Sequence, residues 1–206
     1  MRRLFCYIIA ASLIAGISCH AQKKNSDFDP FTATIEENLS TPAVQSKHSE
    51  TVSTAMGLLL RTLRKAGYNV TGVRSGEVVM VTIPCSDLFG ANSTKLKPDA
   101  GKILSPLRPY MTRTDNYKVM IAVHTDNTGD AIYADQISSE RANAIDEFYF
   151  HASGDNETGF IPYGLGADEP VASNAGIASR AKNRRVEIYF VPTTQFIEKA
   201  RKNKAI

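Results

Sequence analysis

An arginine within the apolar face of an amphipathic helix is the feature that most constrains this chain. Arg141 lies in the middle of that face, and Asp126 precedes it by fifteen residues. A guanidinium keeps its proton and is costly to bury unpaired, so a carboxylate or an anionic ligand should meet it there. Asp126 is the obvious candidate for that role. At about 100° per residue, the apolar arc collects Ala134, Ile137, Ala144, Ile145 and Phe148.

The remaining pattern predicts strands that alternate with helices. A helix should begin near Pro98 and bend or break at Pro106, and the Arg141 helix should end near Gly154. In the last strand, apolar and polar residues alternate around Glu187, which suggests that one face of this strand is more exposed than the other. The order β-α-β-α-β-β predicts an α/β sandwich with a mixed sheet. The expected strands are Glu77–Ile83, Tyr117–Val123, Phe160–Leu165 and Val186–Val191.

The N-terminus has the form of an export signal. Arg2 and Arg3 precede an uncharged stretch, Leu4–Ser18, which is too short for a comfortable membrane span and suits a secretory signal. Two endings remain open. The signal either ends before a lipidated Cys19 or is cut after residue 21. The mature protein is therefore expected to be exported.

The rest of the chain divides into four parts. Residues 22–47 are polar and predict a linker, and residues 48–67 predict an amphipathic helix that ends at Gly67. Residues 68–192 form the compact domain, and residues 193–206 form a basic tail. The tail could pack on the domain, meet acidic lipid or bind a protein partner. The apolar stripe of the helix consists of Val52, Ala55, Met56, Leu59, Leu63 and Ala66.

Composition excludes several classes of function. A net charge of +3 in 206 residues is too small to indicate nucleic-acid binding. Cys85 would be the only cysteine left in the domain, and a packed small residue is favoured there over a reactive thiol. His124 shows no metal-ligand spacing, and the chain has no dinucleotide fingerprint or serine nucleophile motif. We therefore expect no metal, no cofactor and no enzyme activity, with a cell-wall hydrolase as a remote alternative.

Four blocks of motif-like sequence occur in order in the second half of the chain. They are His124-Thr-Asp-Asn-Thr-Gly129, Ile137-Ser-Ser-Glu-Arg-Ala142, Gly164-Leu-Gly-Ala-Asp-Glu-Pro-Val-Ala-Ser-Asn174 and Arg180-Ala-Lys-Asn-Arg-Arg-Val-Glu187. With these blocks the chain resembles the OmpA-like C-terminal domain family over about residues 77–191. Such a resemblance implies a βαβαββ module that binds peptidoglycan, and too few residues precede residue 68 for a transmembrane barrel, as in a peptidoglycan-associated lipoprotein. The chain departs from the family pattern at Ala134, where Asn is common, and at Ile137, which replaces Leu.

The resemblance also implies a ligand and its contacts. Asp126 and Arg141 would hold the diaminopimelate of the stem peptide, with Asp126 on its ammonium and Arg141 on its carboxylate. The loop containing Thr128 could add backbone donors. Asn92 is either a ligand contact or a turn residue. Of Arg184 and Arg185, one is expected at the ligand while the other braces a loop.

The function implied is a non-catalytic anchor that ties the outer membrane, on its periplasmic face, to the cell wall. The main alternative is an envelope scaffold that docks a protein partner, with Asp126 and Arg141 forming only a structural ion pair. A flagellar stator is disfavoured because the N-terminal apolar stretch is short and has no ionisable residue for ion conduction.

Overall fold

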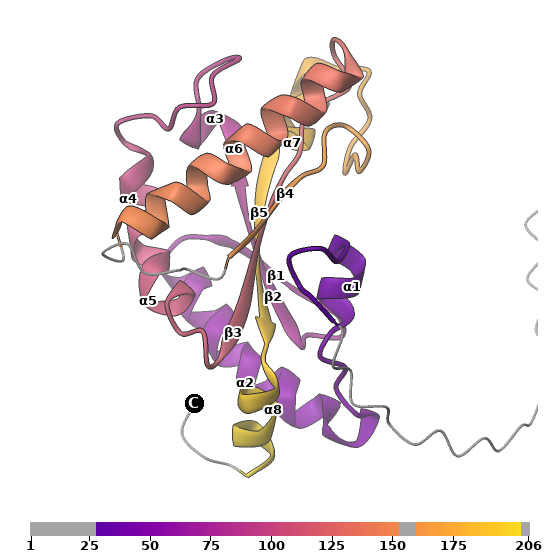
Figure 1. Cartoon of the computed structure of the whole chain (residues 1–206), viewed down its shortest axis with the longest axis vertical. Coiled ribbons are helices and arrows are strands. Elements are labelled where there is room, and N and C mark those ends of the chain that lie inside the picture. The colour runs from indigo at the N-terminus through magenta and orange to yellow at the C-terminus, as the bar shows by residue number, and fades with distance from the viewer. Residues whose placement is uncertain (1–27, 153–159, 203–206) are drawn as a thin grey trace, which may run out of the picture.

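The computed structural model describes residues 28–152 and 160–202, and its centre is a five-stranded mixed sheet (Figure 1). The strand order is β1-β2-β5-β3-β4. β3 and β4 are parallel, and the other neighbours are antiparallel. The α/β architecture with a mixed sheet is confirmed. The strands are β1 (Asn69–Val73), β2 (Val78–Pro84), β3 (Tyr117–Val123), β4 (Ile161–Gly164) and β5 (Arg185–Pro192).

The central strand, β5, corrects one expectation. Every residue of β5 is buried, because helices or other chain segments cover both faces and β2 and β3 flank both edges. Glu187 is therefore inside the protein and not on an exposed face. β1 was also not predicted, and it extends the sheet by pairing with β2 from Asn69↔Thr82 to Val73↔Val78.

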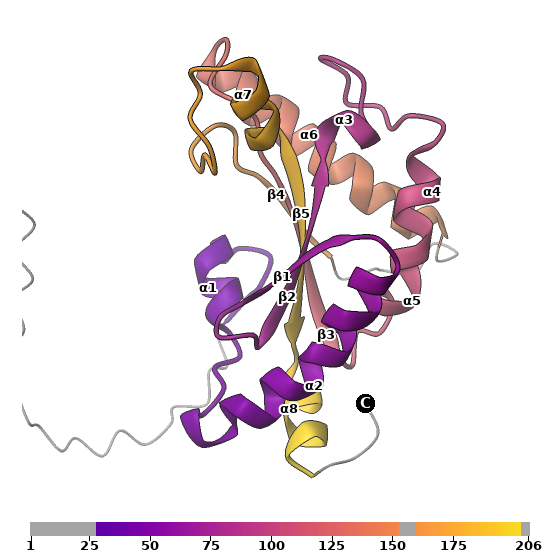
Figure 2. The same cartoon turned by 180° about the vertical axis from the view of Figure 1, so that it is seen from behind.

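Most of the helices cover one face of the sheet and bury the larger core with it (Figure 2). The apolar stripe of α2 faces this core, and the helix ends before Gly67, whose φ of 95° suits a glycine. The expected break near Pro106 is confirmed as a 3₁₀ turn between two short helices. These helices are α2 (Ser46–Lys65), α4 (Ala100–Leu104), η1 (Ser105–Leu107), α5 (Arg108–Met111), α6 (Ala131–Ala152) and α8 (Thr194–Arg201).

The opposite face is covered by α1 (Ile35–Ser40). This helix lies within residues 22–47, which the sequence predicted to be a linker. Thr34 and Glu37 form a capping box, and Ile35 packs into a second apolar cluster on this face. Lys118 Nζ donates to Asn38 O at 2.7 Å and to Thr41 O at 2.6 Å, which holds the C-terminal end of the helix. From residue 28 onward this segment is thus part of the folded unit.

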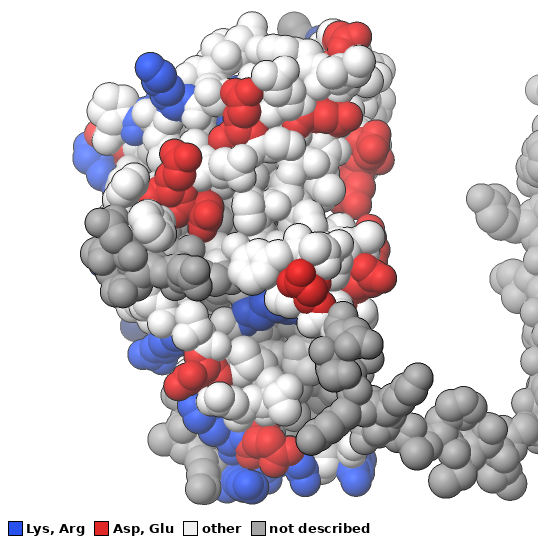
Figure 3. Space-filling view, in the orientation of Figure 1, with Lys and Arg blue, Asp and Glu red and all other residues white. Residues whose placement is uncertain are grey.

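α8 lies within the basic tail, and its position shows where this part of the tail packs. Phe196 and Ala200 are buried in the main core, and α8 packs against α2. Basic side chains gather at this end of the molecule (Figure 3). Packing on the domain is therefore the outcome for residues 194–201. The predicted signal with Cys19 and the predicted turn at Gly154 lie outside the described residues. Among residues 28–152 and 160–202, none of the helices combines the length and the apolar character that a membrane span requires.

Candidate functional site

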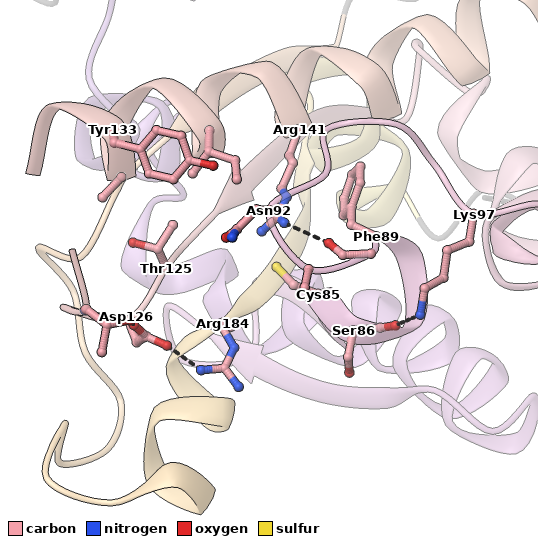
Figure 4. A pocket seen from close by; sticks show the side chains of 15 residues that line it. Cys85, Ser86, Phe89, Asn92, Lys97, Thr125, Asp126, Tyr133, Arg141 and Arg184 are labelled. Atoms are coloured by element: carbon pink, nitrogen blue, oxygen red, sulfur yellow. Dashed lines mark hydrogen bonds and ion pairs between the residues drawn. The ribbon is translucent and has the colours of Figure 1, made fainter. Parts of the chain in front are cut away.

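A pocket of about 450 Å³ lies at the edge of the sheet where β2 and β3 end and β5 begins. β5 runs antiparallel to both neighbours, so β2 and β3 are parallel to each other and finish at the same edge. Short helix α3 (Cys85–Leu88) follows β2, and α7 (Ile177–Asn183) precedes β5. The pocket thus collects residues from distant parts of the chain (Figure 4). Of the predicted residues, Asn92, Asp126, Thr128, Arg141 and Arg184 line it.

Arg141, on α6, is 6% exposed and holds the loop of residues 90–93, which also lines the pocket. Its Nε donates to Ser93 O at 2.9 Å, and its Nη2 donates to Gly90 O at 3.2 Å. The Phe89 ring centroid lies 5.1 Å from the Arg141 guanidinium carbon, within cation–π range. Among residues 28–152 and 160–202, no carboxylate forms an ion pair with Arg141. The buried charge of Arg141 is therefore stabilised by the dipoles of two backbone carbonyls and by the ring of Phe89.

Asp126 pairs with Arg184 instead of Arg141. Its Oδ2 accepts from Arg184 Nη1, and its Oδ1 accepts from the backbone N–H of Thr128 at 2.9 Å and from the Thr128 hydroxyl. Burial disfavours the charged carboxylate, but the hydrogen bonds from Thr128 and Arg184 outweigh it and lower the pKa of Asp126. The ion pair of Asp126 with Arg141, which the sequence left open as an alternative, is absent among the described residues, because Arg184 pairs with this carboxylate.

Asn92 and Thr128 both line the pocket. Asn92 is exposed and adopts a φ of 50°, so it forms a turn and also faces the pocket. The expected backbone donors of the loop 127–130 are partly occupied. Thr128 N–H is directed at Asp126, and Asn127 N–H donates to Asn174 Oδ1 at 3.4 Å. These two N–H groups hold the loop and the Asp126 carboxylate in place, so they do not form a separate anion site.

Arg185 does not line the pocket, which corrects its place among the candidate ligand contacts. Its Nε donates to Glu187 Oε1 at 2.7 Å, and its Nη1 donates to Glu169 O at 3.1 Å. Glu187 Oε2 also accepts from the Tyr189 hydroxyl at 2.5 Å and lies 3.2 Å from His124 Nε2. Arg185 is therefore the residue that braces a loop, and Arg184 is the one that faces the pocket.

Sequence reasoning did not select Lys97 or Tyr133, which also line the pocket. Lys97 Nζ donates to the carbonyl of Ser86 at the end of the pocket away from Asp126 (Figure 4). No motif marked these residues, because strand and loop packing alone brings them to the pocket. Ala134 and Ile137, the two departures from the family pattern, line it as well.

Cys85 lies in the pocket wall as a packed residue, as predicted. Its side chain is buried, and burial raises the pKa of the thiol to about 11, so it stays protonated near neutral pH. Within the described part of the chain, no group of three His, Cys, Asp or Glu side chains could hold a metal ion. The pocket can recognise charges on a ligand through four charged side chains, those of Asp126, Arg141, Arg184 and Lys97.

Residues 88–184 match the OmpA family. The chain is 37% identical over 101 residues to the outer-membrane lipoprotein YfiB of Pseudomonas aeruginosa, covering 49% of this chain and 60% of that protein. It is 34% identical over 118 residues to the peptidoglycan-binding protein ArfA of Mycobacterium tuberculosis, covering 51% and 36%.

Among solved structures, the fold is similar to the cell wall anchor of the T6SS from Pseudomonas aeruginosa. The TM-score is 0.56 with 27% identity, and the match covers 66% of this chain and 96% of that structure. The family match spans the loop, strand and helices that carry Asn92, Asp126, Thr128, Arg141 and Arg184.

Proposed function

The chain contains an OmpA-like domain at residues 88–184, and from that premise we propose that it binds peptidoglycan non-catalytically through the diaminopimelate of the stem peptide. The observation that carries this proposal is the buried Arg141 guanidinium without an acidic partner among the described residues. A buried cation needs a compensating anion, and the carboxylate that could have filled this role pairs with Arg184. A ligand carboxylate would complete the site.

The roles follow from the charges on a free amino-acid end. Diaminopimelate presents an ammonium and a carboxylate on one carbon, so a single recess with one acid and one base can bind both. Arg141 binds the carboxylate with the N–H groups left over from Ser93 and Gly90. Asp126 binds the ammonium with the remaining lone pairs of its carboxylate. Asn92, Thr128 and Arg184 flank the ligand.

The setting we propose is the cell envelope, with the protein anchoring the outer membrane to the wall from the periplasmic side. The names of the relatives support an envelope protein, since one is an outer-membrane lipoprotein and another binds peptidoglycan. The chain aligns with 60% of the first relative and 36% of the second. Lipidation at Cys19 stays a prediction.

Two observations speak against the alternative, a scaffold that docks a protein partner. The ion pair of Asp126 with Arg141 that accompanied this alternative is not formed, because Asp126 pairs with Arg184. The apolar faces of α2 and α8 are turned into the core, where Val52, Met56 and Phe196 are buried. A protein partner in the envelope stays a prediction without an assigned surface.

The test is a calorimetric titration of the purified protein with a muropeptide that contains diaminopimelate. We expect saturable binding that weakens by more than about ten-fold in Asp126→Asn and in Arg141→Met, because each loses a charged hydrogen-bonding partner. Arg108→Met, which removes an exposed arginine from α5, is the matched control and should bind like the wild type. Circular dichroism and thermal melting would check that each variant is folded.

Two outcomes would contradict the proposal. One is a folded wild-type protein that binds no muropeptide. The other is binding that is unchanged in both folded pocket variants, since the ligand would then sit elsewhere. A muropeptide with lysine in place of diaminopimelate separates recognition of the free amino-acid end from general wall binding, because lysine keeps the ammonium but lacks the carboxylate on the same carbon.

A further inference from the structure

The pocket carries more positive than negative charge. Its charged lining residues are three cations, Lys97, Arg141 and Arg184, and one acid, Asp126. Arg184 and Asp126 neutralise each other through their ion pair. Arg141 and Lys97 have no acidic partner within the described parts of the chain. Two cations facing one pocket therefore remain uncompensated.

The two uncompensated cations occupy different parts of the pocket. Arg141 is fixed by the carbonyls of Ser93 and Gly90. Lys97 Nζ donates to Ser86 O and keeps further protons for another acceptor. Figure 4 shows Lys97 at the end of the pocket away from Asp126, with Phe89 and Asn92 between them. A ligand that reaches from Asp126 past Arg141 toward Lys97 would meet one acid followed by two bases.

A single free amino-acid end does not balance this arrangement. Its ammonium joins the existing pair of Asp126 with Arg184 and its carboxylate matches Arg141, which leaves Lys97 without a counter-charge. A second carboxylate on the same ligand, beyond the first, would supply that counter-charge. Diaminopimelate has two carboxylates, one at each end. The carboxylate on the end joined to the stem peptide is free when diaminopimelate is the last residue, and it forms an amide bond when the stem continues.

We propose that Lys97 is a specificity residue that recognises this second carboxylate, so that the pocket prefers stem peptides that end at diaminopimelate. The inference rests on the proposed function, because it assumes that diaminopimelate occupies the pocket. It adds a requirement on how the wall has been trimmed, since a carboxypeptidase-type hydrolysis must remove the residues after diaminopimelate to create this ligand.

The experiment compares two tripeptides that differ by one charge. One is L-Ala-γ-D-Glu-diaminopimelate with both diaminopimelate carboxylates free. The other has the carboxylate nearer the peptide bond converted to a carboxamide, which is nearly the same size. Calorimetry on the wild type should show the free acid binding about five-fold more tightly, as expected for one partly exposed charge pair. In Lys97→Met the two peptides should bind equally.

Lys95→Met is the matched control, because Lys95 is also exposed and lies two residues away but does not line this pocket. It should keep the five-fold preference. Equal binding of both peptides to the wild type would overturn the inference and leave the proposed function standing. A preference that persists in Lys97→Met would overturn the assignment to Lys97. Failure of the folded wild type to bind either peptide would overturn the proposed function itself.

Discussion

Two adjacent arginines, Arg184 and Arg185, have different surroundings and different roles. The Arg184 side chain is 42% exposed and faces the pocket, where it pairs with Asp126. The Arg185 side chain is 5% exposed and pairs with Glu187 inside the protein. Arg184 is the C-cap residue that follows α7 and Arg185 begins β5, and successive side chains point to opposite sides where a strand begins. The sequence predicted one arginine of each kind but could not assign them.

At the residue scale, Thr128 should set the pH range over which the ligand ammonium binds. Its hydroxyl and its backbone N–H both donate to Asp126 and help to lower the pKa of that carboxyl. An ammonium is held only by the ionised carboxylate, so affinity is present above the pKa of Asp126 and is lost as pH falls through it. In Thr128→Val the hydroxyl donor is gone and the pKa rises. Affinity should then be lost at a higher pH than in the wild type.

Muropeptide titrations at several acidic pH values would measure this shift. Thr112→Val is the control, since its hydroxyl donates to Arg108 O on α5 and does not touch the pocket. Superimposable acid profiles for Thr128→Val and the wild type would show that the Thr128 hydroxyl does not control the ionisation of Asp126.

At the element scale, the position of α6 depends on a close approach to β4. Gly164 ends β4, and a Cβ added there would overlap Ser139 of α6, with Ser139 Cα at 2.5 Å. Ser139 precedes Arg141 by two residues, so a shift of the helix moves the guanidinium. Gly164→Ala should destabilise the protein by about 1–3 kcal/mol, as is usual for overpacking. It should also weaken muropeptide binding.

Urea unfolding and titration of the same variant would test both effects. The matched control is Gly101→Ala in α4, where an added Cβ would meet its nearest atom at 3.8 Å and alanine suits a helix. It should be neutral or slightly stabilising. Wild-type stability in Gly164→Ala would mean that α6 and β4 can separate without cost.

The elements that the sequence predicted are those with strong periodicity. α2, α6, β2 and β3 have long apolar patterns, and all appear close to the expected bounds. β1 was missed because Asn69, Thr71 and Gly72 weaken its pattern, and pairing with β2 together with burial of Val70 in the core stabilises it. α1 was missed because it has six residues, although Thr34 and Glu37 form a recognisable capping signal.

At the scale of the whole molecule, the pocket exists because the sheet brings three strand ends to one edge. The resemblance to a family identified Asp126 and Arg141, and both line the pocket. Their separation into two charge systems could not be predicted, because it depends on the position of Arg184 between α7 and β5. Lys97 was missed for the same reason, since only the path of the loop after α3 places it there. The basic end at α8 lies at the opposite end of the molecule (Figures 1 and 3).

The whole fold should also lose stability in acid through Glu187, at the centre of the sheet. Burial opposes its charge, but hydrogen bonds from His124, Tyr189 and Arg185 outweigh this effect and lower its pKa from 4.5 to about 2. A carboxyl whose pKa is lower in the folded state stabilises the protein fully above the unfolded value. That contribution, on the order of 3 kcal/mol, should disappear as the pH falls from about 4.5 to about 2.

Glu187→Gln tests this expectation because glutamine keeps the size of the side chain and removes its charge. Near neutral pH the variant should be less stable by about 3–5 kcal/mol, since the charge of Arg185 is left buried without its partner. Free energies of unfolding, measured in urea from pH 7 to pH 2, should converge for the two proteins as Glu187 becomes protonated. Glu198→Gln, which removes a half-exposed carboxylate on α8, should change stability little. Curves for Glu187→Gln and the wild type that stay parallel down to pH 2 would contradict the role of Glu187, because the loss would then come from packing and not from charge.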